Sequence, residues 1–586
     1  MDILLFASAY NGMTQRIHCE LEALGHDVSI ELSDDEATMV RRAEAVAPDL
    51  IICPFLKHRV PDRVWQAYPC LIVHPGIEGD RGPSSLDWAV TRGDHRWGVT
   101  LLQADREMDA GDIWGTREFD MRPAGKGSLY RREVIAAAAD LVRQALEDHL
   151  DPSFRPRPLD YARPQVRGRL HEPIRQASRR IDWSRESTGE IVTKIQAADG
   201  FPGVLDQIGG AAVHLFGAVA DHELHHRRKP GEVLGHRHGA ICRATLDGAV
   251  WIRQLRQATM EGRRFAKLPA MLALGSIVPE QVWVNGLEPL GPSPADEIRV
   301  WVDDGVAHIE FDFYNGAMST EQCDRLAEAL RQTKRRDDVR VIVLMGGQDF
   351  WSNGIHLGCI EVADSPALES WRNINAMNDL VREIVLTEDK ITVAALRTNA
   401  GAGGAILPLA CDVVVARSGV VLNPHYQTMG LYGSEYWTYL LPRRVGPSRA
   451  EVLTSSCLPV LADDALRLRL VDRVLPEDWR QYHDVLARHC RTLAADEPFR
   501  RRLDAKARTR AADEARRPLE TYREEELRRM KATFDDPGAS YHRLRHDFVY
   551  KINCGGTPAR LLGRGRGKAA HASGSEPAPA ALAASD

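Results

Sequence analysis

A histidine at the end of an apolar run is the first residue of this sequence whose setting suits catalysis. His74 closes the run 70–74 and is followed by Pro75 and Gly76. An ending of this kind presents an imidazole at the carboxyl edge of a sheet, where ligands bind in α/β proteins. Asp109, in a Gly-flanked loop about 35 residues later, could reach it and share in proton transfer. Two structural alternatives stay open: a buried strand-end histidine and a turn aspartate.

A glycine-rich run marks a second stretch with chemical potential, in the C-terminal half. Residues 401–404 are Gly-Ala-Gly-Gly, and Gly354 has a similar setting about 50 residues earlier. Glycines beside strand ends let backbone N–H groups approach a ligand closely. Two N–H groups that converge on a carbonyl form an oxyanion hole for a thioester. Alone, the run is weak evidence, because any tight turn uses glycine.

The elements that would carry the first group alternate regularly. Apolar, strand-like segments and polar, helical segments follow one another through the first 110 residues. This alternation predicts a parallel sheet with helices on both faces. The predicted strands are 3–7, 27–32, 50–53 and 71–73, and the predicted helices are 14–24, 38–46 and 128–150.

Proline-rich passages divide the 586 residues into an α/β multidomain protein. We predict a parallel α/β domain over 1–160 and a smaller β-rich unit over 165–285, with a helix at 187–198. A further domain covers 295–560, beginning with a strand-like segment 299–312 and becoming mostly helical beyond Asp463. The Ala/Gly/Pro/Ser-rich tail 563–586 is expected to be disordered.

Composition excludes several classes of protein. The net charge of −6 gives no reason to expect nucleic acid as a partner, and no apolar stretch is long enough to span a membrane. The ten cysteines show no CxxC spacing and no signal peptide precedes them, so we expect reduced thiols, a cytoplasmic location and no metal site. The His-rich segment 214–238 is expected to be an exposed polar loop, with a metal site as the alternative.

Four motifs in order resemble those of the 10-formyltetrahydrofolate-dependent formyltransferase family, across roughly residues 1–285. They lie at 72–76, 81–83, 98–100 and 108–112. The resemblance implies that 10-formyltetrahydrofolate is the formyl donor, and that the smaller unit is the C-terminal domain of that family, an OB-like fold.

The same resemblance implies roles for individual residues. His74 and Asp109 match two of the three residues that assist attack of a nucleophile on the formyl group. Ile72 stands where the family has an Asn whose amide donates to the developing oxyanion, and loss of such a donor costs about 10²–10³ in rate. The implied folate-binding residues are Gln15, Arg16, Ile72, Arg81 and Gly82; for Gln15 and Arg16 a helix-surface role is an equal alternative.

Segments of the C-terminal half look like the crotonase (enoyl-CoA hydratase/isomerase) family, across about residues 295–560. They lie at 350–355, 401–404, 410–416, 429–431 and 441–446. The resemblance implies a ββα spiral fold and coenzyme A as ligand, bound near Gly354 and Gly404. It also implies that the N–H groups of Ile355 and Gly403 form the oxyanion hole.

Both glutamates that a hydratase uses are missing, since the matching positions hold Ile406 and Tyr426. Plain hydration of an enoyl-CoA is therefore not expected. Glu435 follows Tyr426 closely in the sequence. Ser434 is expected to cap a helix that begins at this point and to direct the Glu435 side chain inward. Tyr426 and Glu435 form a candidate proton-transfer pair. The alternatives are a first-turn carboxylate at Glu435 and a packed aromatic at Tyr426.

The two-part architecture is similar to a family of NiFe-hydrogenase maturation factors. The resemblance implies an enzyme that transfers formyl from 10-formyltetrahydrofolate to coenzyme A and then decarbonylates formyl-CoA to carbon monoxide and coenzyme A. Its implied partners are small-molecule substrates and other NiFe-hydrogenase maturation proteins. Two alternatives stay open: a formyl-CoA hydrolase or formyltransferase, and a non-catalytic protein that binds folate and coenzyme A and carries a one-carbon unit.

Overall fold

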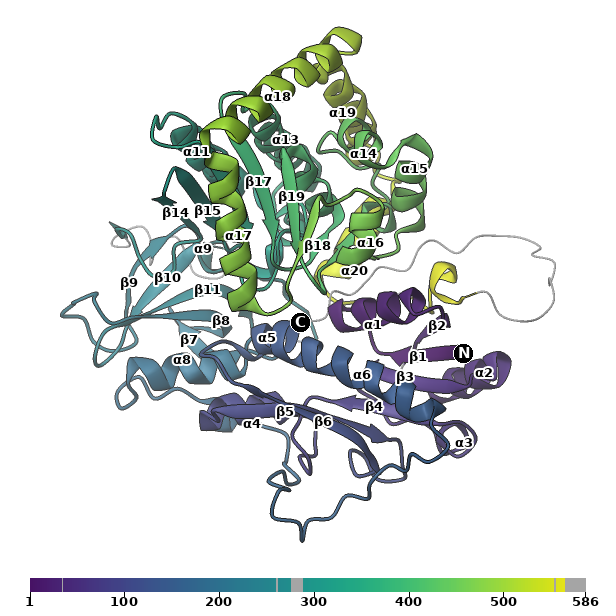
Figure 1. Ribbon diagram of the computed structural model, residues 1–586. Helices are drawn as coiled ribbons and strands as arrows, with labels where there is room; N and C mark the ends of the chain where they lie inside the picture. The colour runs from purple at the N-terminus through teal and green to yellow at the C-terminus, as the bar shows by residue number, and fades with distance from the viewer. Residues whose placement is uncertain (34, 260–261, 276–287, 553–554, 564–586) are drawn as a thin grey trace. The chain divides into compact units, whose positions relative to one another are not determined.

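The computed structural model describes residues 1–586 except 34, 260–261, 276–287, 553–554 and 564–586 (Figure 1). The described chain forms two units, one of residues up to 296 together with the segment after 554, and one of residues 297–553. Both predicted parts of the N-terminal half, 1–160 and 165–285, therefore belong to a single unit. The tail predicted to be disordered lies outside the described residues except for Gly563.

The first unit begins with a six-stranded sheet in the order β2-β1-β3-β4-β5-β6. Strands β1 to β4 are parallel, as the alternation predicts. The prediction of a wholly parallel sheet is wrong at the edge, where β5 is antiparallel to both β4 and β6. The strands are β1 (Asp2–Ala7), β2 (Asp27–Leu32), β3 (Leu50–Phe55), β4 (Cys70–His74), β5 (Arg96–Gln103) and β6 (Ile113–Asp120).

Helices cover both faces of this sheet because its central strands are apolar on both sides. Alternate residues of β1 and β3, such as Leu4 and Ile51, pack with Met39 of α2 (Glu36–Val46) and Val64 of α3 (Asp62–Trp65). Helices α1 (Gly12–Ala23) and α6 (Ile135–Leu150) pack together and cover the other face (Figure 1). The short helices α4 (Ser85–Arg92) and α5 (Lys126–Leu129) complete this part.

A seven-stranded, largely antiparallel sheet forms the rest of the first unit. Its core contains Trp251, whose indole N–H donates to Asp221. The His-rich segment is only partly the loop we predicted, because His214 and His236 lie on strands. The elements are α7 (Gln176–Arg179), α8 (Thr188–Ala197), β7 (Val204–Ile208), β8 (Ala211–Asp221), β9 (Val233–Arg237), β10 (Ala240–Ala244), β11 (Ala249–Gln257), β12 (Lys267–Pro269), α9 (Ala270–Gly275) and β13 (Glu288–Pro289).

The second unit is built on two sheets, in the orders β14-β15-β16-β17-β19-β22 and β18-β20-β21. The strand-like segment 299–312 lies in a hairpin of two strands, because Asp304 and Gly305 take positive φ and turn the chain. The strands are β14 (Ile298–Asp303), β15 (Val306–Phe311), β16 (Val341–Gly346), β17 (Ile391–Leu396), β18 (Ala400–Gly401), β19 (Val413–Arg417), β20 (Val421–Asn423), β21 (Val460–Leu461) and β22 (Arg473–Leu475).

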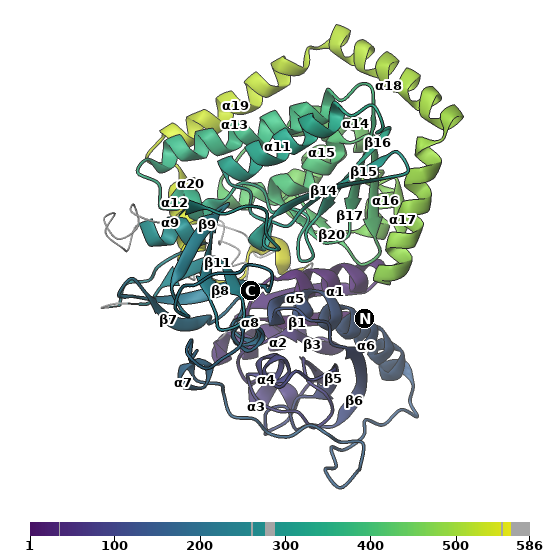
Figure 2. The same ribbon diagram turned by 90° about the vertical axis from the view of Figure 1, so that its left-hand side faces the viewer.

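Helices surround these sheets, and the C-terminal ones follow one another along the outside of the unit (Figure 2). Helix α19 packs on α13 and α14, so its buried face reaches the core of the unit. The helices are α11 (Thr320–Lys334), α12 (Leu357–Glu361), α13 (Pro366–Val385), α14 (Trp437–Val445), α15 (Pro447–Ser456), α16 (Ala462–Arg467), α17 (Trp479–Ala494), α18 (Asp496–Arg516), α19 (Leu519–Asp535) and α20 (Ser540–Val549).

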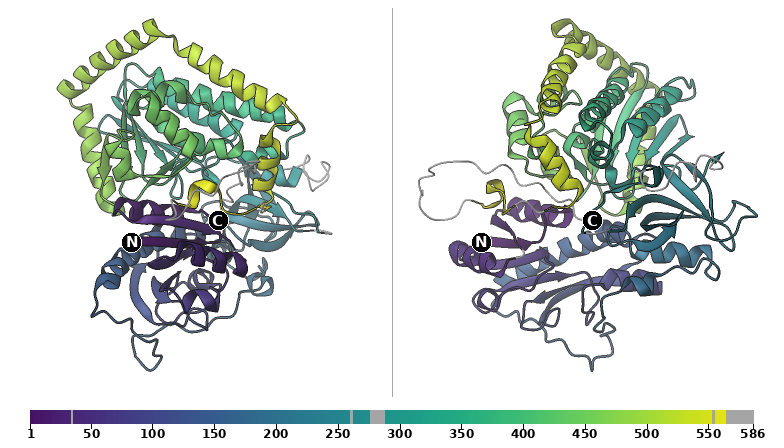
Figure 3. Two further views of the ribbon diagram at one scale, coloured as in Figure 1. Left: turned by 90° about the vertical axis from the view of Figure 1, so that its right-hand side faces the viewer. Right: turned by 180° about the vertical axis from the view of Figure 1, so that it is seen from behind.

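After the second unit the chain returns to the N-terminal sheet. Thr557 accepts from the backbone N–H of Leu32 at 2.7 Å and donates to Glu31 at 2.5 Å, both on β2. Arg42 of α2 donates to the carbonyl of Leu562. Figure 3 shows this short yellow segment against the purple N-terminal elements. Residues 297–553 are therefore joined to the first unit through both of their ends.

Candidate functional sites

His74 is the last residue of β4, and the structure surrounds its ring with carboxylates. Its Nδ1 lies 3.5 Å from Oδ1 of Asp109, so the two predicted residues are brought together. Asp109 takes a positive φ of 56° in the loop between β5 and β6. Its other oxygen accepts from the backbone N–H of Gly82 at 3.2 Å. This contact folds the loop back toward the end of β4.

Asp80 is a third member of this group, and the sequence analysis missed it. Its Oδ2 lies 3.0 Å from Nε2 of His74, and its side chain is completely buried. Burial alone would lower the pKa of His74, but the hydrogen bond to Asp80 and the charge of Asp109 outweigh it and raise that pKa. The ring is thus held between two carboxylates that favour its protonated form.

The Gly-rich loop that carries Asp80 is held in place by a proline-rich segment, 152–168, which lies where we predicted the first two domains to be divided. Arg157 donates to both oxygens of Glu78, at 2.6 Å each, and Tyr161 donates to the carbonyl of Gly79. Gly168 donates to the carbonyl of Glu78, and a side chain there would collide with the backbone of Asp80. The segment therefore positions the loop as well as connecting two parts of the chain.

The other residues expected to bind folate have mixed surroundings. Arg81 pairs with Glu107 and donates to the carbonyl of Met108, so it lies beside Asp109. Gln15 donates to the carbonyl of Tyr10, just before α1. Arg16 donates to Glu20, one turn further along the same helix. Those contacts do not bring either side chain to His74. Their role in folate binding stays a prediction.

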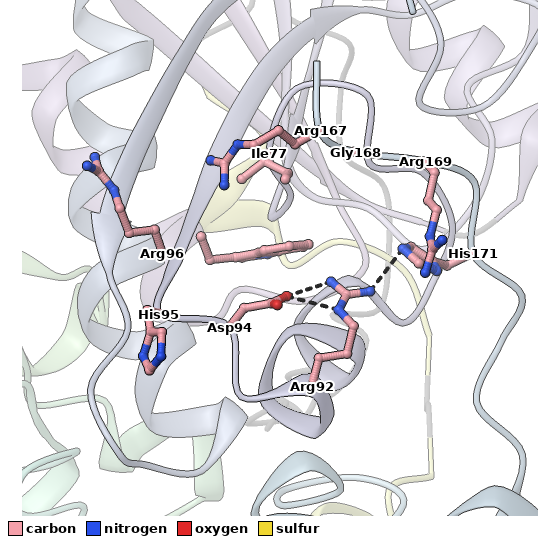
Figure 4. Close-up of a pocket in the computed structure, with 10 residues that line it drawn as sticks. Ile77, Arg92, Asp94, His95, Arg96, Arg167, Gly168, Arg169 and His171 are labelled. Carbon is pink, nitrogen blue, oxygen red and sulfur yellow. Dashed lines mark hydrogen bonds and ion pairs between the residues drawn. The ribbon is translucent and has the colours of Figure 1, made fainter. Parts of the chain in front are cut away.

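A cavity of about 400 Å³ adjoins the loop after β4 (Figure 4). Four arginines, at 92, 96, 167 and 169, reach it, but three of them are paired with carboxylates. Arg92 binds Asp94, and Arg96 and Arg167 both approach Glu118. Arg92 also contacts Nε2 of His171 at 3.1 Å, and that nitrogen lies 3.8 Å from Asp80. The cavity is therefore connected to the His74 group through His171.

The predicted oxyanion-hole residues of the second unit lie close together. A Cβ added to Gly354, the residue before Ile355, would lie 3.3 Å from the backbone nitrogen of Gly403. A side chain at Gly404 would collide with the carbonyl of Ser352. The backbone segments 352–355 and 403–404 thus approach each other as closely as glycine allows.

Glu435 reaches this same point from a distant part of the chain. Its carboxyl carbon would lie 2.6 Å from a Cβ added to Gly403, so the carboxylate packs directly on the predicted oxyanion hole. The residue is 3% exposed. Burial raises the pKa of Glu435 to about 7. A carboxyl group with such a pKa can both take up and release a proton near neutral pH.

Ser434 does not cap a helix, and this part of the prediction is wrong. Gly433, Glu435 and Tyr436 all have positive φ, which delays the helix α14 until Trp437. The Ser434 hydroxyl accepts from Asn378 instead. Because Glu435 lies before the helix, the alternative of a first-turn carboxylate is also excluded.

Glu526 of α19 takes the place of the missing cap, and the sequence analysis missed it. It accepts from the backbone N–H groups of Tyr436 and Thr438, at 2.9 and 2.8 Å. Burial, with a smaller contribution from the charge of Glu435, raises the pKa of Glu526 to about 8. The second site therefore contains two buried carboxyl groups with raised pKa values.

Tyr426 lies in the same region, between Gly433 and Trp437. A side chain at Gly433 would collide with its ring, and Trp437 packs against it with ring centroids 6.4 Å apart. Among the described residues its buried hydroxyl has no hydrogen-bond partner. Burial and the charges of Glu435 and Glu526 raise the pKa of Tyr426 well above its usual value. A phenol of this kind stays protonated and can donate to a ligand.

Glu526 gives the protein a stability that depends on pH. A carboxyl group with a raised pKa binds its proton more tightly in the folded than in the unfolded state, so its stabilising effect is lost as pH rises from about 4.5 to about 8. We expect the urea midpoint to fall over this range, with a loss on the order of a few kcal/mol. Glu526→Gln should flatten this dependence, whereas the exposed control Glu524→Gln should not. An equally steep fall in Glu526→Gln would contradict the assignment.

No described helix is long and apolar enough to cross a membrane. Within the described ranges, no three His, Cys, Asp or Glu side chains come together as metal ligands would.

Comparisons with known proteins agree with both halves of the chain. The family model "Formyl transferase" matches residues 11–137, and "Formyl transferase, C-terminal domain" matches 173–269. "Enoyl-CoA hydratase/isomerase" matches 302–546. Together the three models cover most of the chain, in the order of the two units.

Similarity to proteins of the same two-part organisation extends over nearly the full length. The hydrogenase maturation factor HoxX of Bradyrhizobium diazoefficiens is 46% identical over 96% of this chain and 97% of its own. The crystal structure of HypX from Aquifex aeolicus in complex with tetrahydrofolic acid has a TM-score of 0.90 and 41% identity, covering 96% of this chain and 98% of that one. A methionyl-tRNA formyltransferase of Roseiflexus castenholzii is 28% identical over 32% of this chain and 58% of its own length.

Proposed function

Because the chain belongs to the HypX/HoxX family of hydrogenase maturation factors, we propose that it makes carbon monoxide from 10-formyltetrahydrofolate in two steps. The first unit would transfer the formyl group to coenzyme A. The second would split formyl-CoA into carbon monoxide and coenzyme A. The tetrahydrofolic acid complex of the Aquifex aeolicus relative supports folate as the donor.

The first step forms a C–S bond and breaks the bond between the formyl carbon and N10 of the folate. The thiol of coenzyme A attacks the formyl carbon, and its proton passes to N10 as tetrahydrofolate leaves. His74 and Asp109, 3.5 Å apart at the end of β4, are suited to this proton transfer. The negative charge that develops on the formyl oxygen needs a donor, and a protonated His74 can supply one.

The second step removes a proton and a thiolate from the formyl carbon. Glu435 would take the formyl proton, and the electron pair of the C–H bond would remain on carbon as carbon monoxide forms. The C–S bond breaks with its electron pair on sulfur, and the thiolate then recovers the proton. Ile355 and Gly403 would hold the formyl oxygen, and the Tyr426 hydroxyl would donate to the leaving sulfur.

One observation carries this proposal: Glu435 is buried directly on Gly403, with its pKa raised to about 7. A base for the formyl proton must lie beside the carbonyl, and it must be ionised at neutral pH in part of the molecules. Its 3% exposure also favours a dry site. Exclusion of water matters, because water would convert formyl-CoA to formate.

Such a maturation step would take place in the cytoplasm, where other NiFe-hydrogenase maturation proteins would receive the product. The scattered cysteines, with no CxxC spacing, are consistent with reduced thiols in such a compartment.

The test is to supply the purified full-length protein with 10-formyltetrahydrofolate carrying ¹³C in the formyl group, and to analyse the headspace gas. We expect labelled carbon monoxide that depends on coenzyme A. Labelled formate without carbon monoxide would instead indicate a formyl-CoA hydrolase. Release of neither product, with folate and coenzyme A both bound, would indicate a carrier.

A further inference from the structure

The donor that the formyl oxygen needs cannot come from the neighbouring position on β4. Ile72 lies two residues before His74, on the same face of the strand, and has no polar atom. The ring of His74 is therefore the nearest candidate on this strand. Which of its two nitrogens faces the substrate depends on what holds the other.

We propose that Asp80 is a positioning residue that keeps a proton on Nε2 of His74 and thereby assigns Nδ1 to the substrate. The inference rests on the proposed formyl transfer. It concerns a residue six positions from the histidine, between the motifs at 72–76 and 81–83.

The position of Asp80 determines which nitrogen of His74 carries the proton. Its Oδ2 lies 3.0 Å from Nε2, and an ionised carboxylate can only accept a hydrogen bond. Nε2 must then be the donor, so it keeps its proton in both the neutral and the charged ring. Nδ1 is therefore the nitrogen that gains and loses a proton. It lies 3.5 Å from Asp109 and faces that residue. A histidine oriented by a carboxylate in this way is the arrangement of the Ser-His-Asp triad.

Two glycines keep the space that this contact requires. A Cβ added to Gly76 would lie 2.5 Å from Oδ2 of Asp80 and 2.6 Å from Cδ2 of His74. Any larger residue at Gly76 would therefore occupy the place of the hydrogen bond itself. Gly168 similarly allows the segment 157–171 to press against the backbone of Asp80. The absence of a side chain at Gly76 and at Gly168 therefore allows Asp80 to pair with His74.

The charge of Asp80 acts mainly on His74, because few other groups are close enough to neutralise that charge. Among the described residues, its Oδ1 has no hydrogen-bond partner. Besides His74, His171 lies close to Asp80, with its Nε2 3.8 Å from Oδ1. Burial lowers the pKa of His171; the charge of Asp80 opposes this effect and Arg92 adds to it, and the net change in the pKa is downward. Asp80 and Asp109 are the charges that act on His74, and both favour its protonated form.

In the proposed first step, the Nδ1–H of a protonated His74 donates to the formyl oxygen as the thiol attacks. This donor would supply what Ile72 cannot. The consequence is a defined pH dependence: formyl transfer requires protonated His74, so the rate falls as pH rises through the pKa of His74.

The experiment compares the pH profile of tetrahydrofolate release in the wild type and in Asp80→Asn. Asparagine can still accept from Nε2 but carries no charge, so the ring keeps its orientation while its pKa drops. We expect the falling limb of the profile to move down by about one pH unit or more. The control Asp151→Asn removes an exposed carboxylate of the same unit that accepts from Ser153, and its limb should stay in place. An unmoved limb in Asp80→Asn would overturn the proposal.

A second measurement on the wild type needs neither activity nor a variant at Asp80. The ¹⁵N shifts of labelled histidine in the full-length protein, with the His74 signals assigned by their loss in His74→Gln, report the tautomer directly. We expect the proton of neutral His74 on Nε2. A proton on Nδ1 would refute the role of Asp80, even if formyl transfer itself occurs. If the tautomer is as expected but no tetrahydrofolate is released at any pH, the proposed function fails and the positioning stands.

Discussion

Replacing His74 by alanine is expected to reduce tetrahydrofolate release by about 10³-fold or more. The substitution removes both the proton carrier and the donor that faces the formyl oxygen. It also leaves the buried carboxylate of Asp80 without its partner, so the variant will be less stable. The measurement is the initial rate of tetrahydrofolate formation by absorbance, with saturating coenzyme A.

Two controls separate lost chemistry from lost folding in His74→Ala. Tetrahydrofolate binding, followed by quenching of protein fluorescence, shows whether the folate site persists. The variant His222→Ala removes an exposed histidine of the same unit that does not line the cavity beside the His74 group, and it should keep the wild-type rate. Unchanged release by His74→Ala would rule out the mechanism proposed for the first unit.

The second large effect is expected at Glu435. In Glu435→Gln, carbon monoxide formation should fall by at least about 10²-fold, because the amide cannot take the formyl proton. Tetrahydrofolate release should continue, since Glu435 belongs to the other unit. In the wild type, carbon monoxide formation should rise with pH through about 7, as Glu435 loses its own proton. The measurement combines headspace carbon monoxide with tetrahydrofolate absorbance in one sample.

The matched control for this variant is Glu451→Gln, on an exposed position of α15. It changes the charge of the same unit by the same amount and should form carbon monoxide at the normal rate. If Glu435→Gln forms both products normally, another group takes the formyl proton. If it loses both products, the two steps are not separable in the way we propose.

Patterns confined to one segment predicted the fold well. The four parallel strands and the helices around them follow from apolar runs that are long and distinct. The prediction of the sheet was wrong where the relative direction of neighbouring strands had to be predicted. Nothing in the composition of β5 indicates that it pairs antiparallel with β4, because that choice depends on the path of the chain between them. The hairpin turn at Asp304 and Gly305, by contrast, has a local signal, because Asp-Gly is typical of a two-residue hairpin turn.

The candidate sites divide in the same manner. The motifs predicted that Asp109 reaches His74, and the structure places the two side chains 3.5 Å apart. They also predicted Glu435 as the proton-transfer partner of Tyr426; the structure places the Glu435 carboxyl group against Gly403, and the pairing with Tyr426 stays a prediction. Glu526 could not be predicted, since it lies about 90 residues from the backbone groups that it caps. Asp80 is only six residues from His74, yet its contact depends on the turn of a Gly-rich loop and on the segment that holds that loop.

The return of residues 557–562 to the N-terminal sheet makes the second unit an insertion rather than an appendage. One proteolytic cut within a single connection would leave the two units covalently joined through the other. A tethered partner is present at an effective concentration on the order of millimolar, whatever the dilution of the protein in the cell. Formyl-CoA is a short-lived thioester. At that effective concentration, the second unit is more able to bind formyl-CoA released by the first unit before it is lost to solvent. Cutting both connections is then the change that should make carbon monoxide yield depend on protein concentration.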